Sequence, residues 1–400
     1  MMFPAPSPYQ LWPYPLKGTR RQLMRLSAAC TVCAVGGNAQ AQNVIRVGPS
    51  HPTKSISSAA AAAQDGDVIE VEAGEYRGDV AVWTKSNITL KGMGGRVRLV
   101  ADGMAAENKG IWVVRGGQMS VEGFDFSGAR VADKNGAGIR LEKGSLTVRD
   151  CTFTNNQNGI LTGNNAQIEL HIQDCEFGHN GHGDGQSHNL YVGEIAQLTV
   201  TGSYFHHAKV GHLLKTRAAV NHILYNRLTD EPGGTASYEM EFAVGGVAYV
   251  VGNVVQQGSQ TQNPHLISYG AEGYKWPRNE LYLINNTLVD NRPHGGVFLR
   301  VKPGEVVLKA VNNLLVGGGK LQAAGPGDYQ NNFNVSWEEF EFAAREDFRL
   351  TGNSRLLGKA VDAGAANGKS LMPDSEYRHP RKVVKLNGRA RHPGALQSAK

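Results

Sequence analysis

The sequence predicts an all-β protein, a single right-handed parallel β-helix (solenoid) with a short N-terminal capping helix and a C-terminal cap and tail. The first observation is a pattern that recurs about every two dozen residues: a short apolar strand, a small or polar residue, then a large apolar one. The second is that apolar and polar residues alternate within each copy, which indicates strands rather than helices. The composition agrees, with 50 Gly and 19% charged residues among 400. Units this short cannot bury an apolar face alone, so they must stack on one another.

The repeat is defined by one anchor position, seen for example at Cys151 within the segment Val148–Phe153. Asparagine occupies four successive anchors. This predicts a buried amide ladder from coil to coil, because a buried amide is tolerated only when its hydrogen bonds are satisfied. Successive anchors are 27, 24, 28, 23, 27, 33 and 27 residues apart. They are Phe124, Cys151, Cys175, Ser203, Asn226, Asn253, Asn286 and Asn313.

Cys151 and Cys175 lie 24 residues apart, at the same point of two consecutive coils. Stacked strands would bring their α-carbons to about 4.8 Å, a separation that permits a disulfide. Two reduced thiols stacked in the core are the preferred interpretation, because in-register strands give an awkward geometry for the bond. The spacing does not indicate zinc.

Residues 1–41 are predicted to be an export signal. A basic stretch ends at Arg25, a modestly apolar stretch follows over Leu26–Gly37, and Ala39-Gln40-Ala41 is a small-x-small cleavage site. Thr19–Arg25 resembles a twin-arginine signal, and an ordinary Sec signal is the alternative. The mature protein is therefore expected in the periplasm or outside the cell. The later sequence has no apolar run long enough for a transmembrane helix, so an integral membrane protein is not expected.

The two ends of the solenoid are predicted to carry caps. The solenoid domain spans residues 42–364 and begins with the strand Val44–Val47. Ser55–Gln64, with its run of alanines, is predicted to be a short helix that covers the N-terminal end of the core. Residues 337–350 form an amphipathic segment expected to shield the other end. The basic tail of residues 365–400 has few apolar residues and is expected to be loosely ordered.

The net charge of +6 does not describe the solenoid itself. Residues 1–41 carry four basic groups and no acid, and the segment from Lys369 to Lys400 carries eight basic residues against two acidic ones. The body between them is therefore near −4. We expect no nucleic-acid partner and only weak attraction for anionic glycans on charge alone. A monomer is expected.

A second sheet is predicted half a coil before the anchors, with one side chain of each strand pointing into the core. The apolar character of this inward row supports its register. The inward row is Ile111, Ile139, Ile160, Leu190, Leu213, Met240, Leu266 and Val297. The outward neighbours one step before are Gly110, Gly138, Gly159, Asn189, His212, Glu239, His265 and Gly296. The outward neighbours one step after include Tyr191, Leu214, Glu241, Ile267 and Phe298.

The polar, titratable outward residues gather in four consecutive coils, with glycine on both sides of them. Stacked side chains lie about 5 Å apart, so we expect His212, Glu239 and His265 to contact one another. A merely solvated face would show scattered Ser, Thr, Asn and Lys instead. The sequence therefore favours a functional site on this face.

Further candidates flank this row. His188 precedes Asn189, while Lys215 and Arg217 follow His212 at the strand end. Strict alternation would point Lys215 inward. We expect it to turn out at a corner, or to bury its aliphatic stem beneath an ammonium that reaches water.

An aromatic loop over Tyr269–Arg278 accounts for the 33-residue repeat. Tyr274 and Trp276 could stack on sugar rings beside the ladder, and a lid packed over the core is the alternative. Tyr269 and Arg300 complete the predicted substrate-binding residues.

The two ends of the chain carry a family resemblance. Val47-Gly48-Pro49, Gln64–Val71 and Gly74–Tyr76 resemble the opening of pectin-lyase-like β-helix proteins. Asp347–Leu350 and His392–Ala395 resemble their usual ending. The resemblance covers roughly residues 44–396 and implies the fold. It does not imply one reaction, because lyases, hydrolases, esterases, epimerases and inert fibres share that fold.

A polysaccharide lyase acting on an acidic glycan is the preferred function. β-Elimination from a uronate needs a cation to neutralise the carboxylate, a base for the C5 proton and an acid for the leaving oxygen. We assign His212 or Lys215 as the base and Tyr191 or His265 as the acid. Arg217 is assigned as the carboxylate clamp.

Calcium is a possible cofactor. Glu239 and Glu241, with Asn189, offer the hard oxygen ligands that Ca²⁺ prefers. Glu239-Met-Glu241 beside a Lys/Arg pair also resembles the alginate and chondroitin lyase branch of this fold. The match is loose, because here the basic residues precede the acidic pair.

Three other functions stay open. Glu239 and Glu241 could be the paired carboxylates of a glycoside hydrolase, although the sequence shows no Asp-Asp cluster of the polygalacturonase kind and no methylesterase set. A non-catalytic glycan-binding or surface-structural solenoid needs only the aromatic loop and the ladder. A C5 epimerase would share the proton abstraction and leave the chain length unchanged.

Overall fold

The computed structural model describes residues 43–261, 263–321 and 325–398. The predicted export signal, residues 1–41, lies outside them. The described residues form one compact unit. Among the described residues, no helix is long and apolar enough to cross a membrane.

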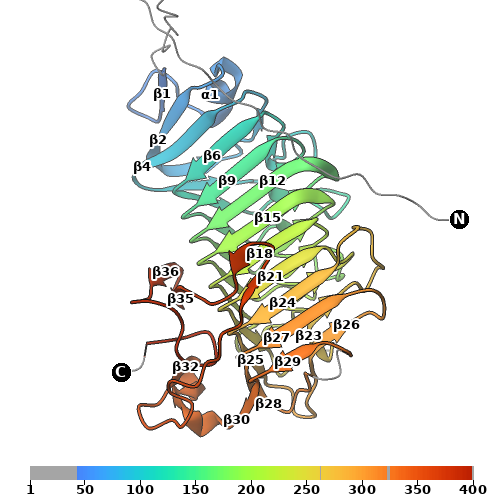
Figure 1. Cartoon of the computed structure of the whole chain (residues 1–400). Coiled ribbons are helices and arrows are strands. Elements are labelled where there is room, and N and C mark those ends of the chain that lie inside the picture. Colours follow the sequence, from blue (N-terminus) through green and yellow to red (C-terminus); the bar gives the residue numbers. More distant parts are fainter. Residues whose placement is uncertain (1–42, 262, 322–324, 399–400) are drawn as a thin grey trace, which may run out of the picture. The chain divides into compact units, whose positions relative to one another are not determined.

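The described unit is a right-handed parallel β-solenoid, as the sequence predicts, and its strands form two long sheets (Figure 1). The nine-stranded sheet contains β3 (Ala81–Trp83), β5 (Gly110–Val114), β8 (Ala137–Leu141), β11 (Asn158–Thr162), β14 (Leu190–Val192), β17 (Leu214–Thr216), β20 (Met240–Phe242), β23 (His265–Tyr269) and β26 (Val297–Val301).

The 21-stranded sheet takes two strands from most coils. It contains β1 (Val44–Val47), β2 (Val68–Arg77), β4 (Ile88–Val100), β6 (Gln118–Glu122), β7 (Phe124–Ser127), β9 (Ser145–Arg149), β10 (Thr152–Thr154), β12 (Asn165–Gln173), β13 (Glu176–Gly178), β15 (Ile195–Thr201), β16 (Tyr204–His206), β18 (Val220–Leu224), β19 (Arg227–Thr229), β21 (Val247–Val251), β22 (Val254–Gln257), β24 (Glu280–Ile284), β25 (Thr287–Asp290), β27 (Val307–Val311), β28 (Leu314–Gly317), β29 (Asp328–Gln330) and β30 (Phe333–Val335).

The predicted asparagine ladder is confirmed. The backbone N–H and the side-chain Nδ2 of Asn226 both donate to Oδ1 of Asn253, at 2.9 and 3.0 Å. The same pair of bonds repeats from Asn253 to Asn286 and from Asn286 to Asn313. A further rung, Asn332, accepts from Asn313 in the same way. Each buried turn thus has its backbone donor satisfied by the next coil.

The cysteine anchors stack one coil apart as free, buried thiols. The preferred interpretation from the sequence is therefore confirmed. Burial raises the pKa of the Cys175 thiol well above its usual value, which keeps it protonated and unreactive.

The N-terminal cap is also confirmed. Helix α1 (Ile56–Ala62) begins after Ser55, whose hydroxyl accepts from the N–H of Ser58. The Asp79 carboxylate accepts from the first two helical N–H groups, at 2.6 and 2.8 Å. Ile56 and Ala59 are fully buried in the solenoid core. The small residues of the helix thus pack against the first coils of the solenoid.

The segment 337–350 packs elsewhere than predicted. It forms two 3₁₀ turns, Trp337–Glu339 and Ala343–Arg345, and the pair β31 (Phe340–Phe342) and β32 (Asp347–Leu350). Phe340 and Phe348 belong to a cluster with Val254 and Leu314, whereas the adjacent residue Val255 faces the main core. The segment therefore covers the flank of the solenoid rather than its end.

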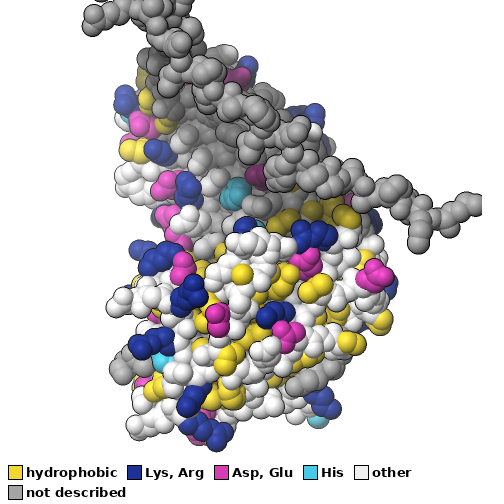
Figure 2. All heavy atoms as spheres, in the orientation of Figure 1, with side chains coloured by type: hydrophobic (Ala, Val, Ile, Leu, Met, Phe, Trp, Pro, Cys, Tyr) yellow, Lys and Arg dark blue, Asp and Glu magenta, His cyan; other side chains and the backbone are white. Residues whose placement is uncertain are grey.

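The basic tail is folded, contrary to the expectation of loose order. It forms β33 (Ala365–Ala366), β34 (Lys369–Ser370), β35 (Ser375–Arg378) and β36 (Lys382–Lys385), which lie along the flank (Figure 1). Leu371, Tyr377 and Ala395 are buried there. Composition hides this packing because only a few apolar residues carry it. In the described part of the face in Figure 2, basic and acidic side chains are interspersed.

Candidate functional site

The register of the nine-stranded sheet places a column of dissimilar residues on its outer face. Cα pairing stacks Tyr191 on Lys215, Lys215 on Glu241, Glu241 on Ser268 and Ser268 on Arg300. These five residues, one from each strand from β14 to β26, are called the outer column here. All five members carry a hydroxyl or a charged group that can form a hydrogen bond or an ion pair.

The predicted inward row is right at four positions and shifted at the others. The observed row is Trp112, Ile139, Ile160, Leu190, Leu214, Met240, Ile267 and Leu299. Corner loops of unequal length cause the shifts. A one-residue slip turns a side chain to the opposite face, which is why Lys215 lies in the outer column without any corner bend.

Glu241 is the centre of a network of buried charges. Its Oε2 lies 3.1 Å from Nε2 of His212 and 2.9 Å from Nζ of Lys215. Nζ of Lys215 also lies 3.0 Å from Oε1 of Glu272, which forms a two-pronged pair with Arg217 at 2.7 and 2.8 Å. The cations Lys215 and Arg217 therefore alternate with the anions Glu241 and Glu272 along the strand ends. We call these four side chains and His212 the charge network.

An aromatic wall stands beside the charge network. The guanidinium carbon of Arg217 lies 5.2 Å from the ring centre of Tyr191, within cation–π range. His188 meets the Tyr191 ring edge-on at 4.7 Å and stacks on His212 at 4.4 Å. Tyr238 meets His212 from another side at 4.9 Å. The imidazole of His212 is thereby held between two rings with its Nε2 aimed at Glu241.

The surroundings set the protonation states of these groups. Burial opposes ionisation of Glu241, but His212 and Lys215 outweigh it and lower its pKa to about 2. Burial alone would lower the pKa of Lys215, yet Glu241 and Glu272 raise it above the usual value. Burial lowers the pKa of His212 despite the nearby Glu241. At neutral pH the site holds a carboxylate, an ammonium and a neutral imidazole.

Glu239 does not lie in the groove as predicted. It is fully buried, both of its carboxylate oxygens lack a hydrogen-bond partner, and its charged neighbours are Asp230 and Asp290. The neighbours of Glu241 are instead His212 and Lys215. The expected contact among His212, Glu239 and His265 is therefore wrong, because Glu239 precedes β20 and turns into the interior at the corner, although Met240 points inward as predicted.

Asn189 is committed to the interior as well. Its Nδ2 donates to the carbonyls of Phe177 and His206, and its Oδ1 accepts from Asn180. Glu239, Glu241 and Asn189 therefore do not converge, and the predicted Ca²⁺ site at these residues does not fit the structure. The predicted pairing of Glu239 with Glu241 as hydrolase carboxylates fails for the same reason.

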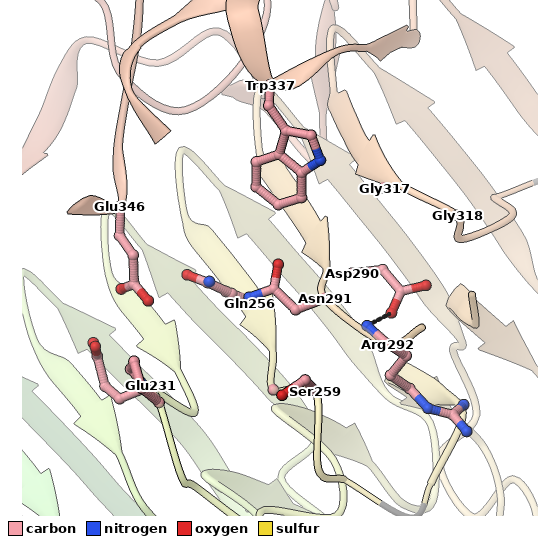
Figure 3. A pocket seen from close by; sticks show the side chains of 12 residues that line it. Glu231, Gln256, Ser259, Asp290, Asn291, Arg292, Gly317, Gly318, Trp337 and Glu346 are labelled. Carbon is pink, nitrogen blue, oxygen red and sulfur yellow. Dashed lines mark hydrogen bonds between the residues drawn. The ribbon is translucent and has the colours of Figure 1, made fainter. Parts of the chain in front are cut away.

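Glu239 instead faces a buried carboxyl column at the end of the 21-stranded sheet. Asp230, Gln257 and Asp290 stack in successive coils there, and each has an oxygen without a partner. Burial raises the pKa of Asp230 to about 7 and that of Asp290 above its usual value. Asp290 also lines a pocket of about 490 Å³ with Gln256 and Trp337 (Figure 3).

The aromatic loop is a lid packed on the core, which is the alternative that the sequence left open. Tyr269 is fully buried in the core, and its hydroxyl donates a hydrogen bond to the carbonyl of Gly246, so it cannot contact a sugar. The Tyr274 hydroxyl donates to the carbonyl of Lys302. Trp276 Nε1 donates to the carbonyl of Arg217 at 3.0 Å. The loop therefore fixes the strand end that carries Arg217.

The remaining predicted residues lie at the margins of the site. Nδ1 of His265 lies 2.9 Å from Oδ1 of Asn263, and the ring is 6.3 Å from that of Tyr238. Arg300 ends the outer column and is exposed. Sequence reasoning missed Glu272 and Tyr238. The 33-residue repeat does signal an inserted loop at Glu272, but no spacing rule places its carboxylate over a strand two coils earlier.

Known structures share this fold. A profile described as a right-handed β-helix region matches residues 84–192. The crystal structure of pectate lyase Pel9A superposes with a TM-score of 0.58 at 14% identity, over 89% of this chain and 97% of that one. A pectin methylesterase bound to a hexasaccharide aligns over 72% of this chain and 80% of that one, at 11% identity and a TM-score of only 0.30. No curated protein sequence matches.

The profile match and the superposition on Pel9A show the fold. The chain is a right-handed parallel β-helix protein whose fold is similar to that of pectate lyase Pel9A. This fold does not identify a reaction, so the reaction must be argued from the site itself.

Proposed function

We propose that the protein is an exported polysaccharide lyase that cleaves an acidic, uronate-containing glycan by β-elimination. The charge network supports this proposal, because it brings two cations, a phenol and a neutral imidazole together on the outer face of the sheet. A uronate needs these groups for elimination. The cations offset its carboxylate, the imidazole takes a proton and the phenol gives one.

The two cations come first in the proposed reaction. In the free protein Lys215 and Arg217 are paired with Glu272, whose side chain is 38% exposed and lies on the loop. A uronate carboxylate would replace Glu272 at both cations. The bound carboxylate then carries less negative charge, which acidifies the hydrogen on C5.

The proton transfers follow. His212 is neutral at pH 7, and its buried Nδ1 has no hydrogen-bond partner. Once substrate binding uncovers Nδ1, it can accept the C5 proton while the electrons of the C5–H bond form the C4–C5 double bond. The Tyr191 hydroxyl then donates its proton to the leaving C4 oxygen. Glu241 remains ionised and stabilises the imidazolium that forms.

The test is incubation of the protein with a panel of uronate polymers. A lyase produces the ultraviolet absorbance of an unsaturated uronate, whereas a hydrolase produces reducing ends without it. Tyr191→Phe should lower the rate by about 10²-fold or more. Tyr282→Phe, a change of the same chemistry on the other sheet, should leave the rate unchanged. Unsaturated product at an unaltered rate from Tyr191→Phe would remove the assigned acid.

One observation favours a second candidate, a glycan-binding or surface-structural solenoid without catalysis. Every ion in the charge network already has a partner, and the side chains of Glu241, Lys215 and Arg217 are only 5%, 13% and 16% exposed. Buried, paired charges also occur as structural networks. This candidate predicts glycan affinity without product in every assay of the panel, and the same affinity in His212→Ala.

A further inference from the structure

Three histidines converge at the corner that follows β13 and β16, away from the outer column. The coordinating nitrogens of His179, His206 and His207 all lie within 4.8 Å of one another. Nδ1 of His206 is 2.8 Å from Nδ1 of His207. The ring of His179 stacks on that of His207 at 4.6 Å and meets that of His206 edge-on at 5.2 Å.

The repeat itself builds this cluster. Gly178 pairs with His206 in the register, so His179 and His207 occupy equivalent positions in consecutive coils. Both have left-handed backbone, with φ of 57° and 46°, a conformation that histidine tolerates better than most residues. The bend turns both side chains to the same side of the corner, where His206 from the strand end joins them.

A glycine and a carboxylate hold the buried ring of His206. A Cβ at Gly178 would lie 2.2 Å from Cε1 of His206, so only glycine leaves room for the ring. On the far side, Nε2 of His206 lies 3.4 Å from Oε1 of Glu176. The ring of Tyr204 stacks on His206 at 4.5 Å. Nδ1 of His206 is therefore directed at the other two histidines.

We propose that His179, His206 and His207 form a binding site for a divalent transition metal, with Zn²⁺ as the ion that it fits best. Three imidazole nitrogens suit zinc, copper or nickel rather than the oxygen-seeking Ca²⁺ or Mg²⁺. Tetrahedral zinc holds nitrogen at about 2.0–2.1 Å, so small ring rotations bring the three donors into place. Glu176 on the opposite nitrogen of His206 is the carboxylate–histidine partner common at zinc sites.

A metal ion binds the neutral form of each imidazole. Three protein ligands leave a fourth position for water or a small anion.

The test is titration of the metal-free full chain with Zn²⁺ against a coloured zinc chelator, repeated with Co²⁺ for the visible absorption of tetrahedral cobalt. The expected result is one ion per chain and a tetrahedral cobalt spectrum. His179→Ala should weaken binding at least about tenfold, and Glu176→Gln should weaken it by about 10-fold to 100-fold. His179 is exposed, so this variant should keep the fold.

His182→Ala is the matched control, because His182 is an exposed histidine of the same loop outside the cluster. It should bind Zn²⁺ with unchanged affinity. Equal affinities for the His179→Ala and His182→Ala variants would overturn the proposal. An octahedral cobalt spectrum in the unaltered chain, or the absence of any stoichiometric Zn²⁺ binding, would overturn it as well.

Discussion

Two columns of side chains run through the same coils and differ in one respect. The interior ladder repeats asparagine at Asn226, Asn253, Asn286 and Asn313, and each amide bonds the next. The outer column changes residue at every coil, and within it Lys215 and Glu241 form an ion pair. The repeated asparagines satisfy the hydrogen bonds of identical backbone turns, whereas the varied residues of the outer column bring unlike groups together. In a solenoid, a column that changes at each coil is therefore the better indicator of a site.

Breaking the interior ladder should have the largest effect. Asn253→Leu removes the acceptor of two N–H groups of Asn226 and the donor to the carbonyl of Ile223. Because these groups stay buried, we expect a loss of about 3–5 kcal/mol in the free energy of unfolding. Urea denaturation measures it. Asn334→Ala, at an exposed asparagine, is the control, and a loss below about 1 kcal/mol for Asn253→Leu would contradict the ladder's role.

Removing the central charge of the outer column should cost less. Glu241→Gln leaves Lys215 with Glu272 alone and should destabilise the protein by about 2 kcal/mol at pH 7. It should also lower the pKa of His212 further, because Glu241 raises it. A proton NMR titration follows that pKa. Ser268→Ala in the same column removes only an unpartnered hydroxyl and should leave both quantities unchanged; an upward shift in the Gln variant would refute the charge coupling.

A substitution in the buried carboxyl column should raise the free energy of unfolding, whereas the two substitutions above lower it. Asp230 has a folded pKa of about 7, raised from 3.8, so the unfolded state ionises first as the pH rises. Asp230 therefore lowers stability progressively between about pH 4 and pH 7. The Asp230→Asn variant should be more stable than the unaltered protein by up to about 4 kcal/mol at pH 8 and equally stable near pH 4. Thermal unfolding at both pH values decides this, and an equal effect at both would contradict the assigned titration.

The smallest effect is expected at a pair outside both columns. Arg46 and Glu70 lie 3.1 Å apart with 61% and 26% of their side chains exposed. Water screens such pairs, so Arg46→Ala should change the free energy of unfolding by less than about 0.5 kcal/mol. A larger change in the same denaturation assay would show that exposed ion pairs between neighbouring coils stabilise the protein more than we expect.

The fold could be predicted from the sequence because it rests on repetition. The Asn anchors and the stacking of Cys151 on Cys175 follow from a period that is visible along the chain, and the capping helix after Ser55 follows from a local run of alanines. The outer column depends on loop lengths at the corners, which differ between coils. A slip of one residue places Lys215 inside, the reverse of the structure. Strand alternation places Glu239 outside, although it lies before β20 and is fully buried. The contact of Glu272 with Lys215 depends on the path of a loop, which no periodicity encodes.

The folded tail changes how the solenoid should come apart. Coils of a solenoid contact only their neighbours, so such proteins can fray from one end. The tail bridges coils that are far apart, since Arg381 donates to Thr152, Asp374 to Tyr225, and Asn285 to the carbonyl of His392. The tail therefore couples distant coils of the solenoid, so that they unfold together. A chain ending at residue 364 should therefore melt over a broader temperature range than the intact protein.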